Sequence, residues 1–159
     1  MISKNKKAFS MFIALAVIIM MSTVAILVVN VSGKIIQTTG DQYRKEQAVL
    51  LAKSYTELAI MAVMSNDRIT QTCLTNINGI IGESSSKVDL GEGYRIATQI
   101  SYIGNNALLG NCAGTALDST VQTPSSAINI LVDVYVRYRE LDNLTSGWIN
   151  YHRRTLQKI

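Results

Sequence analysis

The run from Ala8 to Gly33 contains no charged residue, no histidine and no proline. Between Phe9 and Val31 only four side chains are polar, namely Ser10, Ser22, Thr23 and Asn30. A helix over this run is long enough to cross the roughly 30 Å hydrocarbon core of a bilayer. A helix of a soluble domain would show a polar stripe instead, and this run has none. The sequence therefore predicts a membrane-spanning helix.

Basic residues at one end of the run predict its orientation. Lys4, Lys6 and Lys7 precede it, and by the positive-inside rule they hold that end in the cytoplasm. Residues 34–159 then lie on the opposite side of the membrane from the cytoplasm. A cleaved secretory signal is the alternative, because Val31-Ser32-Gly33 ends in a small residue, but the apolar part of such signals has only about 7 to 15 residues. The same lysines carry most of the net charge of +4, so charge gives no argument for a nucleic-acid partner.

The start of the apolar run has a distinctive order of residues. From Lys6 to Leu15 it is K-K-A-F-S-M-F-I-A-L, in which basic residues and a small residue precede the first Phe of an uninterrupted apolar helix. It resembles the class III leader of type IV pilins and of the pseudopilins of type II secretion systems. The resemblance implies that a prepilin peptidase cuts between Ala8 and Phe9 and methylates the new amino group of Phe9. It also implies that the helix carrying Phe9, Phe12 and Ile13 assembles with other pilin-like subunits.

Three positions differ from the pattern of that family. Ala8 stands where Gly is usual, and Ile13 stands at the fifth mature position, where Glu is usual. In a filament that Glu is taken to pair with the terminal amine of a neighbouring subunit, which Ile13 cannot do. We therefore expect a minor subunit, although other groups could provide the pairing, with Ser10 the nearby polar candidate. Major pilins also have a proline partway along the helix, where this chain has Asn30, and its sole proline is Pro124.

A second apolar pattern extends the helix beyond the membrane. Between Asp41 and Met64 one face at helical spacing holds Ala48, Leu51, Ala52, Tyr55, Leu58, Ala59, Ala62 and Val63. The other faces hold Arg44, Lys45, Lys53 and Glu57. A continuous helix from Phe9 to Met64 is about 84 Å long, and Gly33 and Gly40 mark where bending should concentrate. A membrane anchor followed by a separate coiled coil also fits this stripe, and the leader favours one long helix.

The segment after the helix is predicted to be irregular. Ser65-Asn66-Asp67 combines a residue that favours a helix C-cap with one that favours an N-cap, so it ends one helix and begins another. A short helix is expected from Arg68 to Ile77. Gly79, Gly82 and the serine run 84–86 then indicate a loop.

Three later segments are expected to be strands. Residues alternate between apolar and polar from Tyr94 to Tyr102, and again from Ala127 to Arg139. The apolar face of the second segment holds Ile128, Ile130, Val132, Val134, Val136 and Tyr138, and its polar face holds Asn129, Asp133, Arg137 and Arg139. Turn signals at Asp142-Asn143 and Ser146-Gly147 precede a third strand from Trp148 to Leu156.

The predicted fold class is α+β, with a long N-terminal helix packed on a small antiparallel meander, which is the order of elements in pilin-like folds. The apolar face from Ile128 to Tyr138 should lie against the helical stripe that contains Leu51, Tyr55 and Leu58. The expected division is a cytoplasmic leader (1–8), an assembly helix (9–33), the amphipathic outer half of the helix (34–66) and an exported α+β domain (67–159).

Cys73 and Cys112 are the two cysteines of the chain, and in an exported domain they predict one disulfide. The bond would stabilise the domain by roughly 4 kcal/mol on the chain-entropy model. It would tie the segment after the helix to a Gly, Asn and Thr rich loop from Gly104 to Pro124. A metal site is not expected, because no further Cys or His lies at ligand spacing. A catalytic thiol is not expected either, because no base is apparent.

Three further features concern polar residues outside these patterns. His152 is the sole histidine and lies on a predicted edge strand, where a solvated side chain is the expected state. The arginines at 137, 139, 153 and 154 could form a basic patch, but alternation sends Arg153 and Arg154 to opposite faces, so we do not expect nucleic acid to bind. Asn143-Leu144-Thr145 matches a glycosylation sequon, a match that we take to be incidental in a chain with a leader of bacterial type.

Two classes of function remain open from the sequence. The favoured one is a minor pilin-like or pseudopilin subunit, held in the bacterial inner membrane and assembled through its apolar helix, with no enzyme activity, cofactor or small-molecule substrate. The alternative is a signal-anchored periplasmic domain with a sensory or adhesive role. An N-methylated Phe9 at the mature terminus would favour the first, and an intact Met1 the second.

Overall fold

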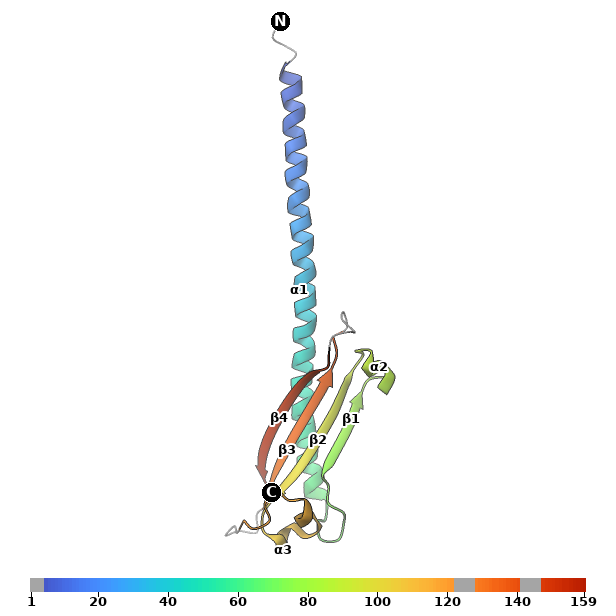
Figure 1. Cartoon of the computed structure of the whole chain (residues 1–159), viewed down its shortest axis with the longest axis vertical. Coiled ribbons are helices and arrows are strands. Elements are labelled where there is room, and N and C mark those ends of the chain that lie inside the picture. Colours follow the sequence, from blue (N-terminus) through green and yellow to red (C-terminus); the bar gives the residue numbers. More distant parts are fainter. Residues whose placement is uncertain (1–4, 122–127, 141–146) are drawn as a thin grey trace. The chain divides into compact units, whose positions relative to one another are not determined.

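The structure is a computed structural model that describes residues 5–121, 128–140 and 147–159, with side chains from Met11 onward. The chain divides into two compact units, Met1–Tyr43 and Arg44–Ile159, and we call the second the head domain. Helix α1 (Asn5–Ser65) belongs to both units (Figure 1). Its residues up to Tyr43 are the described part of the first unit, and its residues from Arg44 onward are the first element of the head domain. It ends at Ser65, as the Ser65-Asn66-Asp67 signal predicts.

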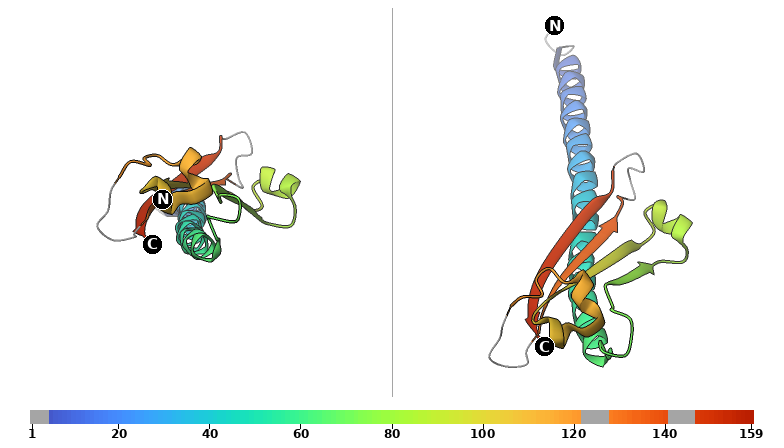
Figure 2. Two further views of the ribbon diagram at one scale, coloured as in Figure 1. Left: turned by 90° about the horizontal axis from the view of Figure 1, so that it is seen from below. Right: turned by 60° about the horizontal axis from the view of Figure 1, so that its bottom comes forward.

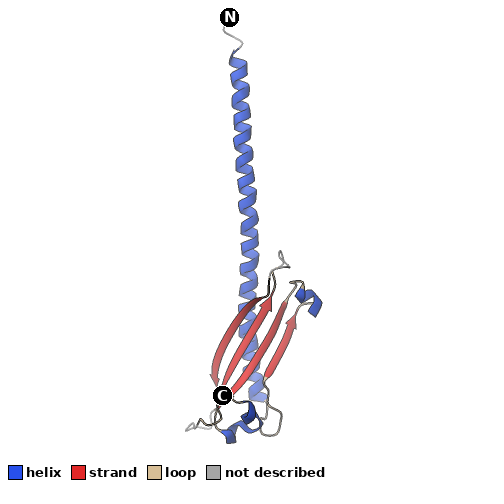
Figure 3. Cartoon of the chain, viewed as in Figure 1, coloured by secondary structure: helices blue, strands red, loops and turns tan. Residues whose placement is uncertain are grey.

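The head domain is α+β, which confirms the predicted fold class. Four strands form one antiparallel sheet in the order β1-β2-β3-β4, so each strand pairs with the next in the sequence (Figure 3). The strands are β1 (Asn76–Ile81), β2 (Tyr94–Ile103), β3 (Asn129–Tyr138) and β4 (Ile149–Lys158). Short helices lie between them, namely α2 (Ser85–Asp89), α3 (Asn106–Leu109) and the 3₁₀ helix η1 (Gly110–Thr115).

The outer part of α1 packs on one face of the sheet, as predicted (Figure 2). Its buried side chains are Ala48, Ala52, Thr56, Ala59 and Val63, which recur every three or four residues and are small enough for close approach to the strands. Leu51 and Tyr55 pack at the margin of the same core. Leu58 was predicted in the stripe, but its side chain is 43% exposed, because the sheet covers a narrower face of the helix than the apolar pattern spans.

The three predicted strands are confirmed as β2, β3 and β4. Their register brings Thr98 opposite Val134, and Val134 opposite Arg153. The face turned toward α1 is built from the alternating residues that the sequence pattern selected, and its members are Tyr94, Ile96, Thr98, Ile100, Tyr102, Ile130, Val132, Val134, Val136 and Tyr138. The predicted turn between β3 and β4 lies largely outside the described residues, as do Pro124 and the Asn143 sequon.

The segment between α1 and β2 differs from the prediction. Instead of a helix over 68–77, the chain forms a turn near Arg68 and then strand β1, which contains Gly79. The expected loop around the serine run holds helix α2, whose first turn is capped by the Ser84 hydroxyl accepting from Lys87 N at 3.2 Å. The pairing of β1 with β2 is a long-range interaction that overrides the weak local preferences of N-I-N-G-I-I. The loop expected from Gly104 likewise contains α3 and η1.

Candidate functional site

The first candidate site is the apolar segment of α1, from Met11 to Ile36. Every large apolar side chain in it is exposed, from 44% at Val17 to 73% at Ile36. Among the described residues this is the one helix that is long and apolar enough to span a membrane. Apolar side chains surround the whole circumference of the helix, and by length and composition this segment is able to span a membrane.

Two hydroxyl groups of this segment are satisfied within the helix. Ser22 Oγ donates to the carbonyl oxygen of Ile18 at 2.9 Å, and Thr23 Oγ1 donates to that of Met20 at 2.8 Å. Hydroxyls paired in this way carry little cost in an apolar medium. Asn30 and Ser32 differ, since neither side chain has a hydrogen bond to any residue that the structure describes.

The structure places the predicted processing and assembly residues on this helix. Phe12 and Ile13 are 72% and 48% exposed. Ala8 and Phe9 lie within the helical backbone of α1, but their side chains fall outside the described residues. The predicted cleavage between them therefore stays a prediction.

Within the head domain, Arg44 of α1 is fastened to the ends of two strands of the sheet. Its guanidinium donates to the carbonyl oxygens of Arg139, after β3, and of Gly91, before β2. Beside it, Tyr94 Oη donates to Gln47 Oε1 at 2.7 Å. The sequence pattern placed Arg44 on a solvent face, because helical spacing does not reveal carbonyl oxygens contributed by distant loops.

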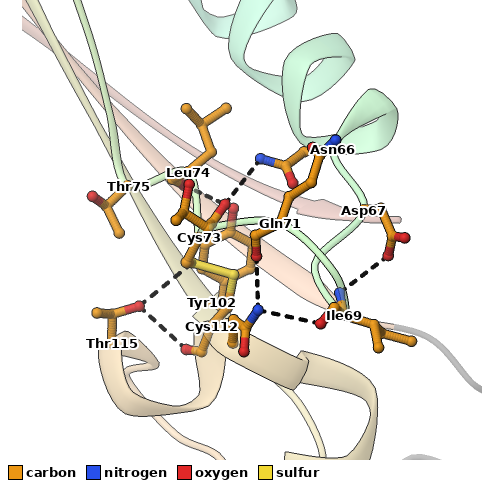
Figure 4. The surroundings of a disulfide bond; sticks show 12 residues. Asn66, Asp67, Ile69, Gln71, Cys73, Leu74, Thr75, Tyr102, Cys112 and Thr115 are labelled. Carbon is orange, nitrogen blue, oxygen red and sulfur yellow. Dashed lines mark hydrogen bonds between the residues drawn. A yellow bond between two sulfur atoms is a disulfide. The ribbon is translucent and has the colours of Figure 1, made fainter.

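The predicted disulfide between Cys73 and Cys112 is present, with the two Cα atoms 4.9 Å apart (Figure 4). It joins the segment after α1 to η1. Hydrogen bonds reinforce the junction: the Asn111 amide donates to the carbonyl oxygens of Ile69 and Gln71 at 3.2 and 2.8 Å. Tyr102 Oη donates to Leu74 O at 2.8 Å. The loop is thus fixed to the end of the helix by covalent and polar contacts.

The outward face of the sheet carries a polar cluster that the sequence analysis missed. Asp133 of β3 was expected in solvent, yet its side chain is only 7% exposed. It accepts hydrogen bonds from Arg154 Nε and Nη2 at 2.8 and 3.1 Å, and its Oδ1 lies 2.6 Å from His152 Nε2. The His152 ring stacks on Tyr135, with centroids 4.4 Å apart. The His152 side chain is 38% exposed, as expected on an edge strand, but it is also held by a hydrogen bond and by ring stacking.

Charge and hydrogen bonding alter the ionisation of this cluster. Burial by itself raises the pKa of the Asp133 carboxyl, but the hydrogen bonds and charges of Arg154 and His152 outweigh it, so the pKa lies below its usual value. The same hydrogen bond and charge raise the pKa of Arg154. Asp133 therefore stays ionised and fastens β4 to β3.

The arginines at 137, 139, 153 and 154 do not form one basic patch. Arg154 is paired with Asp133, whereas Arg153 lies opposite Val134 on the face turned toward α1. The Arg139 guanidinium lies 4.9 Å from the ring centroid of Trp148. Alternation along β4 sends Arg153 and Arg154 to opposite faces of the sheet, as predicted. Within the described ranges, no three His, Cys, Asp or Glu side chains gather where they could hold a metal ion.

Comparisons of the chain with known protein families, with curated proteins and with solved structures found no match.

Proposed function

We propose that this chain is a minor pilin-like or pseudopilin subunit of a type IV pilus or type II secretion type filament. The observation that carries the proposal is the exposed apolar segment of α1, Met11–Ile36, in the same helix that packs on the sheet of the head domain. The leader residues before Phe9 support it, because basic residues and a small residue precede the apolar run.

The apolar segment would serve as both anchor and assembly surface. Before assembly it would lie in the bacterial inner membrane, with the lysine-bearing end in the cytoplasm and the head domain on the periplasmic side. In a filament the helices of neighbouring subunits would replace the lipid. Van der Waals packing can hold such helices together, and the hydroxyl groups of Ser22 and Thr23 are already satisfied within the helix.

We propose a structural role for the head domain rather than a catalytic one. Cys73 and Cys112 are joined to each other, and His152 is held by Asp133 and Tyr135. The disulfide, the Arg44 contacts and the Asp133 cluster each fasten one part of the domain to another. Such cross-links suit a subunit that keeps its shape while its helix exchanges lipid for protein.

Processing of the N-terminus tests the proposal. The full chain is expressed with a prepilin peptidase, and the terminus of the purified product is determined by mass spectrometry. We expect a chain that begins at N-methylated Phe9. An Ala8→Leu variant is the matched control, because a large residue before the cut should block cleavage. An intact Met1 in the native chain would contradict the proposal and favour a permanently anchored binding domain.

A further inference from the structure

A hollow of about 530 Å³ lies on the sheet face turned away from α1. Its walls come from three strands: Asn78 and Ile80 of β1, Arg95 of β2 and Arg137 of β3. Between Asn78 and Tyr135 the register places Ala97, whose methyl group is too small to fill the space. The hollow therefore has the small Ala97 at its floor, with apolar and polar groups on the β1 side and arginines on β2 and β3.

Two like charges stand opposite each other in this hollow. Arg95 and Arg137 are register partners on β2 and β3. Like charges in directly opposed positions destabilise a sheet. Arg95 is neutralised by Asp89, with its Nε at 3.0 Å and its Nη2 at 2.7 Å from Oδ1. Arg137 is exposed and has no ion pair or hydrogen bond with any residue that the structure describes.

The net charge of the side chains that line the hollow favours a ligand with a single negative charge. Since Arg95 and Asp89 cancel, Arg137 leaves a single positive charge, which matches a carboxylate better than a doubly charged phosphate. A guanidinium presents a planar fork of donors that fits the two oxygens of a carboxylate. Ile80, which is 49% exposed, and Ala97 offer apolar contacts for the remainder of an organic acid.

We propose that this hollow is a binding site for an organic carboxylate. Arg137 binds the carboxylate group, Arg95 flanks it in the orientation that Asp89 and Ser85 fix, and the apolar part of the ligand lies on Ile80 and Ala97. The site is formed within the head domain and does not depend on assembly through α1.

Binding can be measured on the full chain in lipid nanodiscs by equilibrium dialysis, with empty nanodiscs as the blank. The probes are N-acetyl-leucine, its uncharged amide and inorganic phosphate, all at constant ionic strength. We expect saturable binding of the carboxylate and none of the amide or phosphate. Trp148, the sole tryptophan, lies 5.7 Å from the Arg95 guanidinium, so its emission gives a second readout.

Three variants distinguish binding in the hollow from non-specific attraction of an anion to a basic protein. Arg137→Gln should weaken binding of N-acetyl-leucine about tenfold or more, because a charge-assisted bidentate contact is lost. Lys158→Gln removes the same charge at the far end of the sheet and should leave binding unchanged. Ala97→Leu should abolish binding by filling the hollow with no change of charge.

Three results would overturn the proposal. One is equal affinity of the native chain and Arg137→Gln, and another is binding of the amide as tight as that of the carboxylate. Saturable binding of phosphate without binding of N-acetyl-leucine would refute the assignment of a carboxylate. The unfolding temperature of each variant confirms that the loss of affinity is not a loss of fold.

Discussion

The phenol group of Tyr55 in α1 occupies the space beside Gly79 in β1, so that a Cβ atom at residue 79 would stand 2.0 Å from Tyr55 Oη. This contact lets the edge strand β1 lie close to the helix. It also explains why a glycine, which weakens strands in general, stands inside this one. The position requires the absence of a side chain rather than an unusual backbone conformation.

Gly79→Ala should therefore destabilise the head domain. The added methyl group would displace Tyr55 or β1, and overpacking of this kind costs about 1 to 3 kcal/mol. Urea unfolding of the full chain in detergent measures the change through the emission of Trp148, which reports on the head domain alone.

Two controls accompany that substitution. Gly114→Ala adds the same methyl group where nothing lies within 4 Å, and it should change the free energy of unfolding little. In a Tyr55→Ala background, Gly79→Ala should lose most of its effect, because the clashing ring is gone. An equal cost in both backgrounds would show that the contact is not the cause.

Asp133→Asn should lower the free energy of unfolding at neutral pH by about 1 to 2 kcal/mol. The neutral carboxamide cannot accept the charge-assisted hydrogen bonds that the carboxylate accepts, while the exposed Arg154 guanidinium remains hydrated. The pKa of Asp133 is lower in the folded chain than in the unfolded chain, where it is about 3.9. The unfolded state therefore binds the proton more readily, and the contribution of Asp133 is present above pH 4 and is lost as the pH falls through the folded-state pKa.

The measurement is the difference in unfolding free energy between the native chain and Asp133→Asn from pH 6 to pH 2. That difference should shrink toward acid. Asp67 and Asp118 also have lowered pKa values, through hydrogen bonds from Thr70 and Thr120 respectively, but their effects are common to both proteins. A difference that stays constant over this range would refute the role given to Asp133.

Removing the disulfide should cost roughly 4 kcal/mol on the chain-entropy model, since 39 positions separate Cys73 from Cys112. The double variant Cys73→Ser, Cys112→Ala avoids an unpaired hydroxyl at the fully buried position 112. Unfolding of the variant is compared with that of the native chain with and without reductant. Full labelling of both thiols in the native chain without reductant would contradict the bond.

Ile13 predicts how the proposed subunit assembles. Without a carboxylate at this position it cannot neutralise the terminal amine of a neighbour, and an unpaired charge in an apolar bundle costs at least several kcal/mol. Expressed with the assembly machinery but without other pilin-like subunits, the chain should form no filaments. With a Glu-bearing major subunit it should be incorporated at low copy number. Long homopolymers of the native chain would refute this prediction.

Asn30 should strengthen association of the apolar segments under the proposed function. A carboxamide in lipid gains a hydrogen bond when another helix supplies the partner, which is worth about 0.6 to 2 kcal/mol. Asn30→Leu should therefore reduce co-purification with pilin-like partners, whereas Val29→Leu should not. The readout is the fraction of partner retained after detergent extraction, and an undiminished fraction for Asn30→Leu would argue against the contact.

The elements that the sequence predicts well are those with a strong local period. Strand β3 alternates for its whole length, and its apolar residues meet those of α1 in one core. Strand β1 has no such signal, because Asn76, Asn78 and Gly79 disfavour strands, and it forms through its pairing with β2. Local patterns therefore indicate which faces are buried better than they identify edge strands.

The polar contacts of the head domain are less accessible to sequence reasoning. Asp133 meets Arg154 and His152 only in the observed β3–β4 register, which the intervening residues do not specify. Arg44 reaches carbonyl oxygens 47 and 95 positions away. The Cys73–Cys112 pairing could be predicted, because two cysteines allow a single internal bond.

Mechanical force applied between α1 and the C-terminal strand β4 would be carried by the Cys73–Cys112 disulfide instead of by the chain between the two cysteines. Cys73 and Cys112 enclose β1 and β2, while α1 and β4 lie outside the loop that they close. If the sheet were pulled open, the chain between the two cysteines, whose sequence separation is 39, could not straighten. About 130 Å of chain is thereby withheld from extension, at the length of a fully extended backbone. Under the proposed function, a subunit under tension would stop extending early, and β1 and β2 would stay within a short covalent loop from which they can pair again when the load is removed.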